Sequence, residues 1–391
     1  MSSETVNPKH VLGIDVLRFI AAMLVLVFHF VFLTTATNES YSGGASRYLV
    51  SFPGNTVWSH FGWVGVQIFF VISGFVIAYS GERATPFSFF SSRLVRLGPG
   101  TWICATITLA VVLGMDADVM ANLRTHWHHY RNSVLFYPFG VWMDGTYWTL
   151  WVEISFYLVV FACIALGRFM LIRPIVIIIG VISSVYWLAQ LLVGEQPQGV
   201  GAWLAQLPES RLATLLLLNH GVFFALGVLL WLQLTKLARL SNLLWGALFI
   251  AAGVVQIVCQ TRQYNLSFHT ASTPYAAVAV WLLALGAIVA SVRHNRALHR
   301  LPQPVLRGLR TLGLMTFPLY LFHEVSGAAV MGWAAAAGCS AWGALAAGVG
   351  ASLLASYVIA KFIEPVVQNI TRACLARARA GLTAVALIVA R

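Results

Sequence analysis

Long apolar stretches dominate the chain and are separated by short polar segments. Ten of them have about the 20 residues that a helix needs to cross a bilayer. They cover residues 11–33, 61–80, 99–115, 147–167, 174–193, 211–233, 242–260, 272–292, 312–333 and 341–363. None alternates apolar and polar residues with the period of two that a membrane barrel needs. The pattern predicts an all-α membrane protein, a bundle of about ten transmembrane helices.

Composition and charge support this class and orient the bundle. Only 9% of the 391 residues are charged, against about 25% in soluble proteins. Of the 24 Lys and Arg residues, 17 fall in segments on one side of the predicted bundle and 5 on the other. By the positive-inside rule the richer side is cytoplasmic, so both termini are predicted there. The net charge of +12 then reflects topology, and membrane lipid, with no nucleic acid, is the expected partner.

The chain divides into a predicted transmembrane domain, 1–367, and a tail, 368–391. The tail is basic and then apolar but too short to span, so we expect it on the inner membrane surface. The segment 116–146 is expected to hold an interfacial helix. Its His126, His128 and His129 have no Cys or acidic ligand close by in the sequence, which favours solvated rings over a metal site. We predict no metal.

The first apolar stretch carries three ionisable residues, Asp15, Arg18 and His29. Each costs at least about 2.5 kcal/mol inside a bilayer, so each is a functional candidate. In an α-helix, the eleven residues from Arg18 to His29 bring the side chain back to within about 20° of its starting direction, about 16 Å further along. The spacing predicts one polar face of this helix, with the Arg18 guanidinium group near its inner end and the His29 imidazole near its outer end.

Depth within the bundle suggests a partner for His29. Counted from the outer ends of their spans, His29 and Glu153 lie at similar depth, so we expect the carboxylate to orient the imidazole as a general base. The alternative is that both merely hold helices together. His323 and Glu324 lie in another span, but neighbouring helical residues point about 100° apart, so both are not expected to face one cleft squarely.

On the cytoplasmic side, Arg93 and Arg96 are three residues apart and share one helical turn, an arrangement suited to gripping phosphates. Ordinary positive-inside anchoring is the alternative. The nearby Arg18, followed by a track toward His29, favours a binding role.

Five motifs resemble the integral-membrane acyltransferase family 3. They are Arg18 and His29 in the first span, GWVGVQIFFVISGFVI over 62–77, SRLVRLGP over 92–99, YWTLWVEISFYL over 147–158 and PLYLFH over 318–323. Their order and their spread over residues 12–323 make the resemblance specific. Gly98, where an aromatic residue is usual, departs from it.

The resemblance implies an O-acyltransferase of the cytoplasmic membrane that moves an acyl group, expected to be acetyl, from cytoplasmic acyl-CoA to a hydroxyl of a surface or lipid-linked glycan. The stand-alone type without an added esterase domain is the expected match. Acetyl-CoA is then a substrate, and no permanently bound cofactor is expected. The implied catalytic residues are His29, Glu153 and Arg18, with Arg93, Arg96, Arg18 and Ser73 on the donor. Secondary candidates, including those for an acceptor cleft, are Asp15, Trp148, Tyr320 and His323.

Two questions stay open at this level. Ser73 is a candidate oxyanion donor for direct transfer, but an acyl-enzyme on His29 or Tyr320 is an alternative. The acceptor could instead be a small secreted metabolite such as a macrolide. From another class, a proton-coupled transporter also uses intramembrane His, Glu and Arg, although no pair of broken helices in corresponding halves indicates one.

Overall fold

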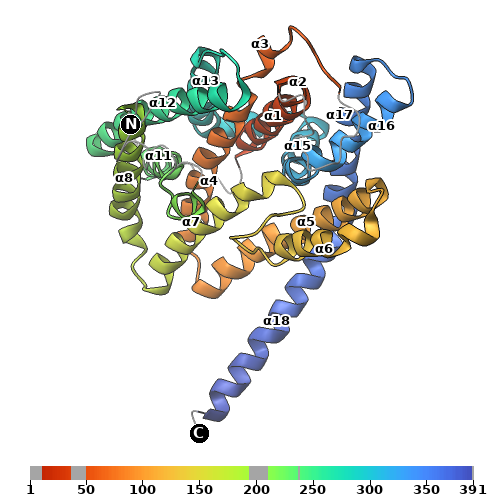
Figure 1. Cartoon of the computed structure of the whole chain (residues 1–391). Coiled ribbons are helices and arrows are strands. Elements are labelled where there is room, and N and C mark those ends of the chain that lie inside the picture. The colour runs from red at the N-terminus through yellow and green to blue at the C-terminus, as the bar shows by residue number, and fades with distance from the viewer. Residues whose placement is uncertain (1–10, 37–49, 193–209, 237, 390–391) are drawn as a thin grey trace.

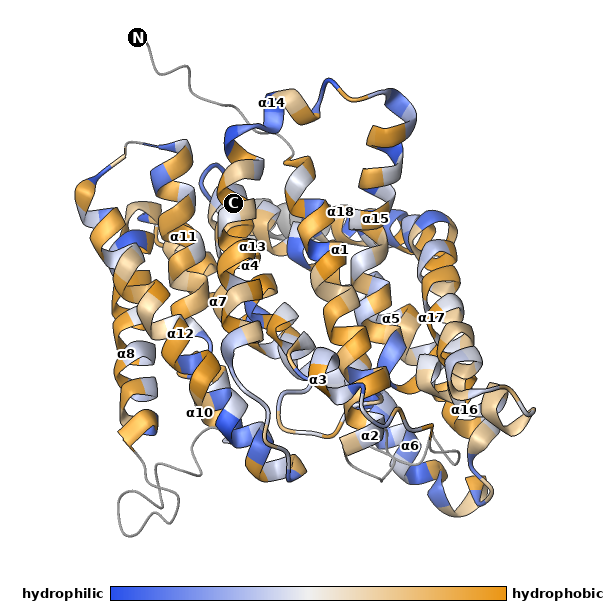
Figure 2. Cartoon of the chain, turned by 90° about the horizontal axis from the view of Figure 1, so that it is seen from above, coloured by the Kyte–Doolittle hydropathy of each residue, from blue (hydrophilic) through white to orange (hydrophobic). Residues whose placement is uncertain are grey.

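The computed structural model describes residues 11–36, 50–192, 210–236 and 238–389. Within these ranges the chain is helical and has no β-strand, which confirms the predicted all-α class. Figure 2 shows apolar residues along the lengths of the helices and hydrophilic residues gathered toward both ends of the bundle. This distribution is that of an integral, multi-pass membrane protein.

The described residues in the first half of the chain form ten helical elements. In order they are α1 (Leu12–Val27), η1 (Phe28–Leu33), α2 (Thr34–Ala36), α3 (Thr56–Ser59), η2 (Gly62–Val64), α4 (Gly65–Gly81), α5 (Pro86–Met115), α6 (Val119–Val134), η3 (Gly145–Tyr147) and α7 (Trp148–Ala165).

The second half continues the same pattern, shown in Figure 1. Its elements are η4 (Phe169–Leu171), α8 (Ile172–Leu192), α10 (Arg211–Leu215), α11 (Gly221–Thr235), α12 (Leu240–Phe268), α13 (Tyr275–Arg293), α14 (Asn295–Leu298), α15 (Gln303–Phe322), η6 (His323–Gly327), α16 (Ala328–Ala336), α17 (Ala341–Val358), η7 (Ile359–Ile363) and α18 (Glu364–Val389).

Eight helical runs in the described part of the chain are long and apolar enough to cross a membrane, and they coincide with eight of the ten predicted spans. The span predicted over 211–233 is wrong in detail, because a turn at 216–220 breaks it into α10 and the short α11. The span predicted over 312–333 falls on α15, η6 and α16, where π-helical η6 interrupts the α-helix.

Helix α4 lies at the centre of the bundle between α1 and α11, and it is buried on almost every side. Two of its glycines allow this close packing. A Cβ atom at Gly65 would overlap the Ala21 carbonyl oxygen of α1, and one at Gly74 would overlap the Phe224 carbonyl oxygen of α11. Small residues let helix backbones approach closely in membranes. The glycines of the 62–77 motif therefore serve packing.

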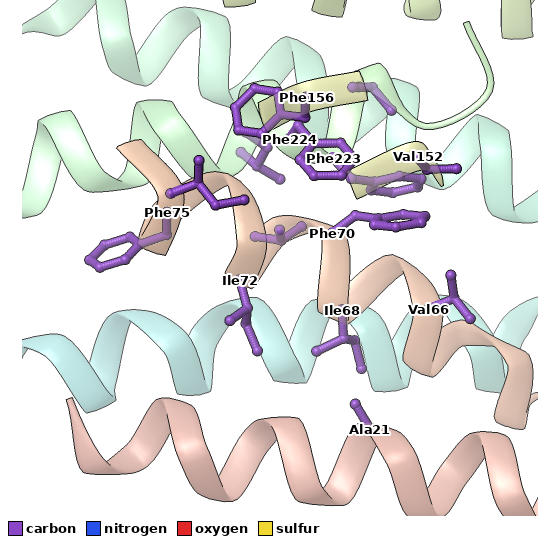
Figure 3. Packing of buried hydrophobic residues seen from close by; sticks show 14 of the residues in the cluster. Ala21, Val66, Ile68, Phe70, Ile72, Phe75, Val152, Phe156, Phe223 and Phe224 are labelled. Carbon is purple, nitrogen blue, oxygen red and sulfur yellow. The ribbon is translucent and has the colours of Figure 1, made fainter. Parts of the chain in front are cut away.

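Aromatic side chains fill the interface of α4, α7 and α11, as Figure 3 shows. Phe224 of α11 lies between Phe70 of α4 and Phe156 of α7, with ring centroids 4.9 Å and 4.6 Å away. On the opposite side of α4, Ile68 points toward Ala21 of α1. This packed core fixes α1, α4 and α7, which carry the predicted site residues Arg18, Ser73 and Glu153.

Three π-helical segments in the described residues, η1, η6 and η7, depart from the regular helices that the sequence predicts, and two of them carry candidate site residues. The first is η1, which continues α1 and contains His29, and the second is η6, which continues α15 and begins at His323. A π-helical turn changes the direction in which later side chains point, and such segments are frequent at functional sites. The rotation estimated for a regular α-helix therefore does not hold at His29.

Helix α6 confirms the helix predicted within 116–146. The expectation that its histidines lack an acidic neighbour is wrong, because Asp116 folds back onto the helix. His126 Nε2 lies 2.7 Å from Asp116 Oδ2. Hydrogen bonds from His126, the Asp118 backbone and Asn122 lower the pKa of Asp116 to about 2.

The predicted tail continues the last helix of the bundle. Helix α17, η7 and α18 form one uninterrupted run from Ala341 to Val389, which passes the predicted domain boundary after residue 367 without a break. Figure 1 shows α18 extending away from the bundle. The guanidinium carbon of Arg379 lies 5.0 Å from the ring centroid of Phe87 at the start of α5.

Candidate active site

Two neighbouring cavities run through the bundle. The inner cavity, of about 390 Å³, opens among residues of α1, α4, α5, α7 and α18 at the end that the charge bias predicts to be cytoplasmic. The outer cavity, of about 640 Å³, lies among residues of η1, α4, α12 and η6 toward the other end. Val66 and Tyr320 line both. The two cavities therefore meet at these side chains, inside the bundle.

Arginines from three helices line the inner cavity. Arg18 comes from α1, Arg93 and Arg96 from α5, and Arg372 from α18. Aromatic rings hold two of the guanidinium groups in place. Arg93 lies 5.5 Å from the centroid of Tyr157, and Arg96 lies 5.2 Å from the Phe317 ring. Cation–π contact fixes a guanidinium group and leaves its N–H donors available. The structure thus brings together the three arginines that the sequence singled out.

Glu153 and Ser73 also line the inner cavity, and this corrects the predicted partner of His29. Glu153 Oε1 accepts hydrogen bonds from Ser73 Oγ at 3.0 Å and Tyr157 Oη at 2.8 Å. It also lies close enough to Arg18 to interact with its charge. Glu153 makes no hydrogen bond to His29 within the described part of the chain. Similar depth placed the two side chains level, but it could not fix which way α7 is rotated.

The contact to Glu153 also bears on Ser73 as an oxyanion donor. A carboxylate only accepts hydrogen bonds, so the Ser73 hydroxyl proton points at Glu153. With its proton donated to that carboxylate in a hydrogen bond, the Ser73 hydroxyl is not available as an oxyanion donor in this arrangement.

In the outer cavity, His29 pairs with a second histidine. His29 Nδ1 lies 2.7 Å from His323 Nε2, and the two rings are stacked with centroids 4.9 Å apart. His323 is fully buried, whereas His29 is partly exposed on the cavity wall. The residues are 294 positions apart in the chain, and each lies in a π-helical segment. The sequence named both histidines but did not pair them.

Glu324 lines the outer cavity, whereas His323 is fully buried behind it and does not, which agrees with the expectation that both do not face one cleft squarely. The carboxyl group packs against Gly145 and lies near the buried Asp144, a residue that sequence reasoning missed. Asp144 in turn accepts from the Val325 backbone N–H at 3.2 Å, which ties η6 to the start of α7.

The remaining wall of the outer cavity is mainly aromatic and uncharged polar, with Arg211 as the one arginine among its described residues. Trp148, one of the predicted acceptor residues, stacks beside His220 with centroids 5.3 Å apart. Gln67 Oε1 and His220 Nδ1 are buried and have no hydrogen-bond partner among the described residues. Leaving a buried polar atom unpaired costs about 1–3 kcal/mol. A ligand that forms hydrogen bonds with these atoms would remove that cost.

Asp15 lies away from the outer cavity. It packs on Gly313 of α15 and lines a third cavity, of about 550 Å³, with Arg18, Arg96 and Arg310. Since Arg18 and Arg96 also line the inner cavity, this third space adjoins the arginine-rich end. The four secondary candidates therefore lie in different places. Asp15 lies at the arginine-rich end of the bundle, and Trp148 lines the outer cavity. His323 contacts His29, and Tyr320 lines both the inner and the outer cavity.

Comparison with known proteins gives a consistent family. A family model described as an acyltransferase domain matches residues 11–361. The exopolysaccharide production protein ExoZ of Rhizobium meliloti is 31% identical over 114 residues, which are 28% of this chain and 35% of that protein. The O-acetyltransferase OatA of Staphylococcus aureus is 25% identical over 170 residues, which are 39% of this chain and 24% of that protein. The matches thus span about a third or less of each relative's length. No solved structure matches the chain.

Proposed function

The chain belongs to the acyltransferase 3 family, and from this premise we propose that it moves an acetyl group from cytoplasmic acetyl-CoA to a hydroxyl of a cell-surface or lipid-linked glycan, as an enzyme of the cytoplasmic membrane. The observation that carries the proposal is the junction of the two cavities. An arginine-lined cavity meets, at Val66 and Tyr320, a cavity that holds an imidazole.

The inner cavity suits the donor. Acyl-CoA carries several phosphate charges, and Arg93, Arg96 and Arg372 surround this space with guanidinium groups that bind phosphate in two-pronged hydrogen bonds. The pantetheine arm is long and thin, and in this proposal it passes Arg18 and Tyr320 to bring the thioester to the outer cavity.

The outer cavity suits a neutral acceptor rich in hydroxyl groups. Gln67 Oε1 requires a donor, and His220 Nδ1 donates or accepts according to its tautomer; a hydroxyl group can do either. Indole rings such as that of Trp148 offer flat apolar surfaces for sugar rings. The relatives' names, exopolysaccharide production protein and O-acetyltransferase, agree with a polysaccharide hydroxyl as the acceptor.

In the reaction, His29 removes the proton from the acceptor hydroxyl while the oxygen attacks the thioester carbonyl. The C–S bond breaks as the C–O bond of the ester forms, and the proton on His29 passes to the departing thiolate of CoA. A positioned general base contributes about 10²–10⁴-fold. A covalent route through Tyr320, which lines both cavities, would give an acyl-enzyme instead.

Inside-out membrane vesicles with radiolabelled acetyl-CoA test the proposal. We expect wild type to move label to glycan or lipid-linked sugar, and His29→Ala to lose at least about 10²-fold of that rate because the base is gone. His29→Ala should still bind CoA, measured calorimetrically on purified protein. His128→Ala, in α6 outside both cavities, is the matched control and should retain activity. Absence of CoA binding by wild type would contradict the donor assignment.

A further inference from the structure

The contacts of His323 determine which of its ring nitrogens carries a proton. His323 Nδ1 lies 3.1 Å from the Leu319 carbonyl oxygen and 3.0 Å from the Tyr320 carbonyl oxygen. A carbonyl oxygen only accepts hydrogen bonds, so Nδ1 must be the donor and hold the proton. When the ring is neutral, His323 Nε2 is left with a lone pair.

This lone pair determines the state of the other ring. His323 Nε2 faces His29 Nδ1 at 2.7 Å, and a hydrogen bond needs one proton between the two atoms. Because His323 Nε2 has none in the neutral pair, His29 Nδ1 must donate. His29 is then the Nδ1–H tautomer, with its lone pair on Nε2, on a ring that lines the outer cavity.

We infer that His323 is the positioning residue of this site: it holds His29 in the Nδ1–H tautomer and thereby makes Nε2 the base that removes the acceptor's proton. The inference rests on the proposed function and names a chain of three groups. It runs from the backbone carbonyls of Leu319 and Tyr320 through His323 to His29.

The three hydrogen-bonded groups have different roles. In serine hydrolases a buried aspartate holds the catalytic histidine in its tautomer. Here a neutral imidazole backed by carbonyl dipoles takes that place, which avoids placing an isolated carboxylate next to His29 in a dry interior. When His29 gains a proton at Nε2, its Nδ1–H bond to His323 becomes charge-assisted and roughly twice as strong. The cation that forms during the reaction is thus stabilised where it arises.

The burial of the two rings explains why His323 orients His29 and why His29 is the one that reacts with the acceptor. His323 is fully buried, and both of its nitrogens are engaged, one by carbonyl oxygens and one by His29. His29 lies on the cavity wall. The π-helical start of η6 places the His323 ring over two carbonyl groups one turn back, at Leu319 and Tyr320.

Three variants of His323 separate positioning from packing. Gln carries an amide oxygen that reaches the place of ring Nε2 and accepts from His29, whereas the shorter Asn does not reach it and Leu accepts nothing. We expect His323→Leu and His323→Asn to lower kcat at least about 30-fold with KM for acetyl-CoA within about twofold, and His323→Gln to stay within about tenfold of wild type. Equal loss in all three, or a loss confined to KM, would overturn the inference.

A measurement without turnover keeps the two proposals distinguishable. Nitrogen-15 NMR of histidine-labelled protein separates protonated from unprotonated ring nitrogens, and the His29 signals are those that His29→Gln removes. We expect the Nδ1–H form in wild type and in His323→Gln, and its loss in His323→Leu. An Nε2–H form of His29 in wild type would overturn the inference even in an active enzyme. The Nδ1–H form in a protein that never consumes acetyl-CoA would leave the tautomer standing and contradict the proposed function.

Discussion

The inner and outer cavities are neighbours with opposite chemistry. The inner cavity is lined by four arginines and one glutamate, Arg18, Arg93, Arg96, Arg372 and Glu153. The outer cavity is lined mainly by amide, imidazole and aromatic groups, and its charged side chains are Arg211 and Glu324. Under the proposed function, most of the charged side chains lie in the inner cavity, where the charged donor would bind. Most of the neutral hydrogen-bonding groups lie in the outer cavity, where acceptor hydroxyl groups would bind. Under the proposed function, this contrast would let one bundle bind two unlike substrates.

The two glutamates sharpen this comparison. Glu153 places a negative charge near Arg18 in the arginine-lined inner cavity. Its Oε1 atom accepts hydrogen bonds from Ser73 and Tyr157. Glu324 lines the other, outer cavity, together with His29. The carboxylate expected to contact His29 therefore lines the inner cavity, and His323, whose ring contacts two backbone carbonyl groups, contacts His29 instead.

The largest predicted effect tests the inner cavity. Replacing both Arg93 and Arg96 with Gln should raise the KM for acetyl-CoA at least about 100-fold, because each hydrogen bond to a charged group contributes about 1.5–3 kcal/mol. Turnover at saturating donor and the KM for glycan should change little. Initial rates over a range of both substrates measure this. Arg124→Gln, exposed on α6, is the control, and an equal loss there would indicate a general charge effect.

The next effect belongs to the outer cavity. Gln67→Leu removes the amide that we expect to bind an acceptor hydroxyl, and it should raise the KM for the acceptor about tenfold while the KM for acetyl-CoA stays constant. Folding should suffer little, because the variant removes the unpaired oxygen of Gln67 and loses only the long hydrogen bond, 3.5 Å, from Gln67 Nε2 to Gln256 Oε1. Steady-state kinetics with a soluble glycan fragment and a thermal melt measure both. A change in the donor KM instead would contradict the separation of the two cavities.

A smaller predicted effect tests whether Glu153 acts in the inner cavity or on His29. Glu153→Gln removes a negative charge beside Arg18, so it should lower the KM for acetyl-CoA about two- to fivefold, more at low than at high salt. Turnover should fall less than in His323→Leu. Rates at two ionic strengths provide the measurement. If turnover collapsed as in His29→Ala at unchanged donor affinity, the original pairing of Glu153 with His29 would be restored.

The smallest effect lies outside both cavities. Asp116→Asn breaks the contact with His126 and should leave transfer unchanged while slightly lowering the melting temperature at pH 7. The folded-state pKa of Asp116 is lowered to about 2. The stability it contributes is therefore present above about pH 4 and is lost as the pH falls toward 2. Melts of wild type and variant should converge over that range, and a constant difference would contradict the ion pair.

The sequence by itself determined the class, the family and the residue types at the site. Apolar stretches of fixed length leave a bilayer helix as the main solution, because backbone polar groups must be satisfied within the segment. Arg93 and Arg96 share a helical turn, and a local regularity of this kind can be read without a structure. Asp15, Arg18 and His29 stood out because charges in such stretches are costly.

Only the tertiary structure decided which side chains meet. The bond from His29 to His323 joins residues 294 positions apart, and it depends on two π-helical segments whose extra rotation no regular periodicity predicts. Depth along the bundle placed Glu153 level with His29, but rotation of α7 turned it to Arg18 and Ser73. Hydrophobic period and length fix how far a residue lies along its helix. Packing of neighbouring helices fixes where it points, and that decided the site.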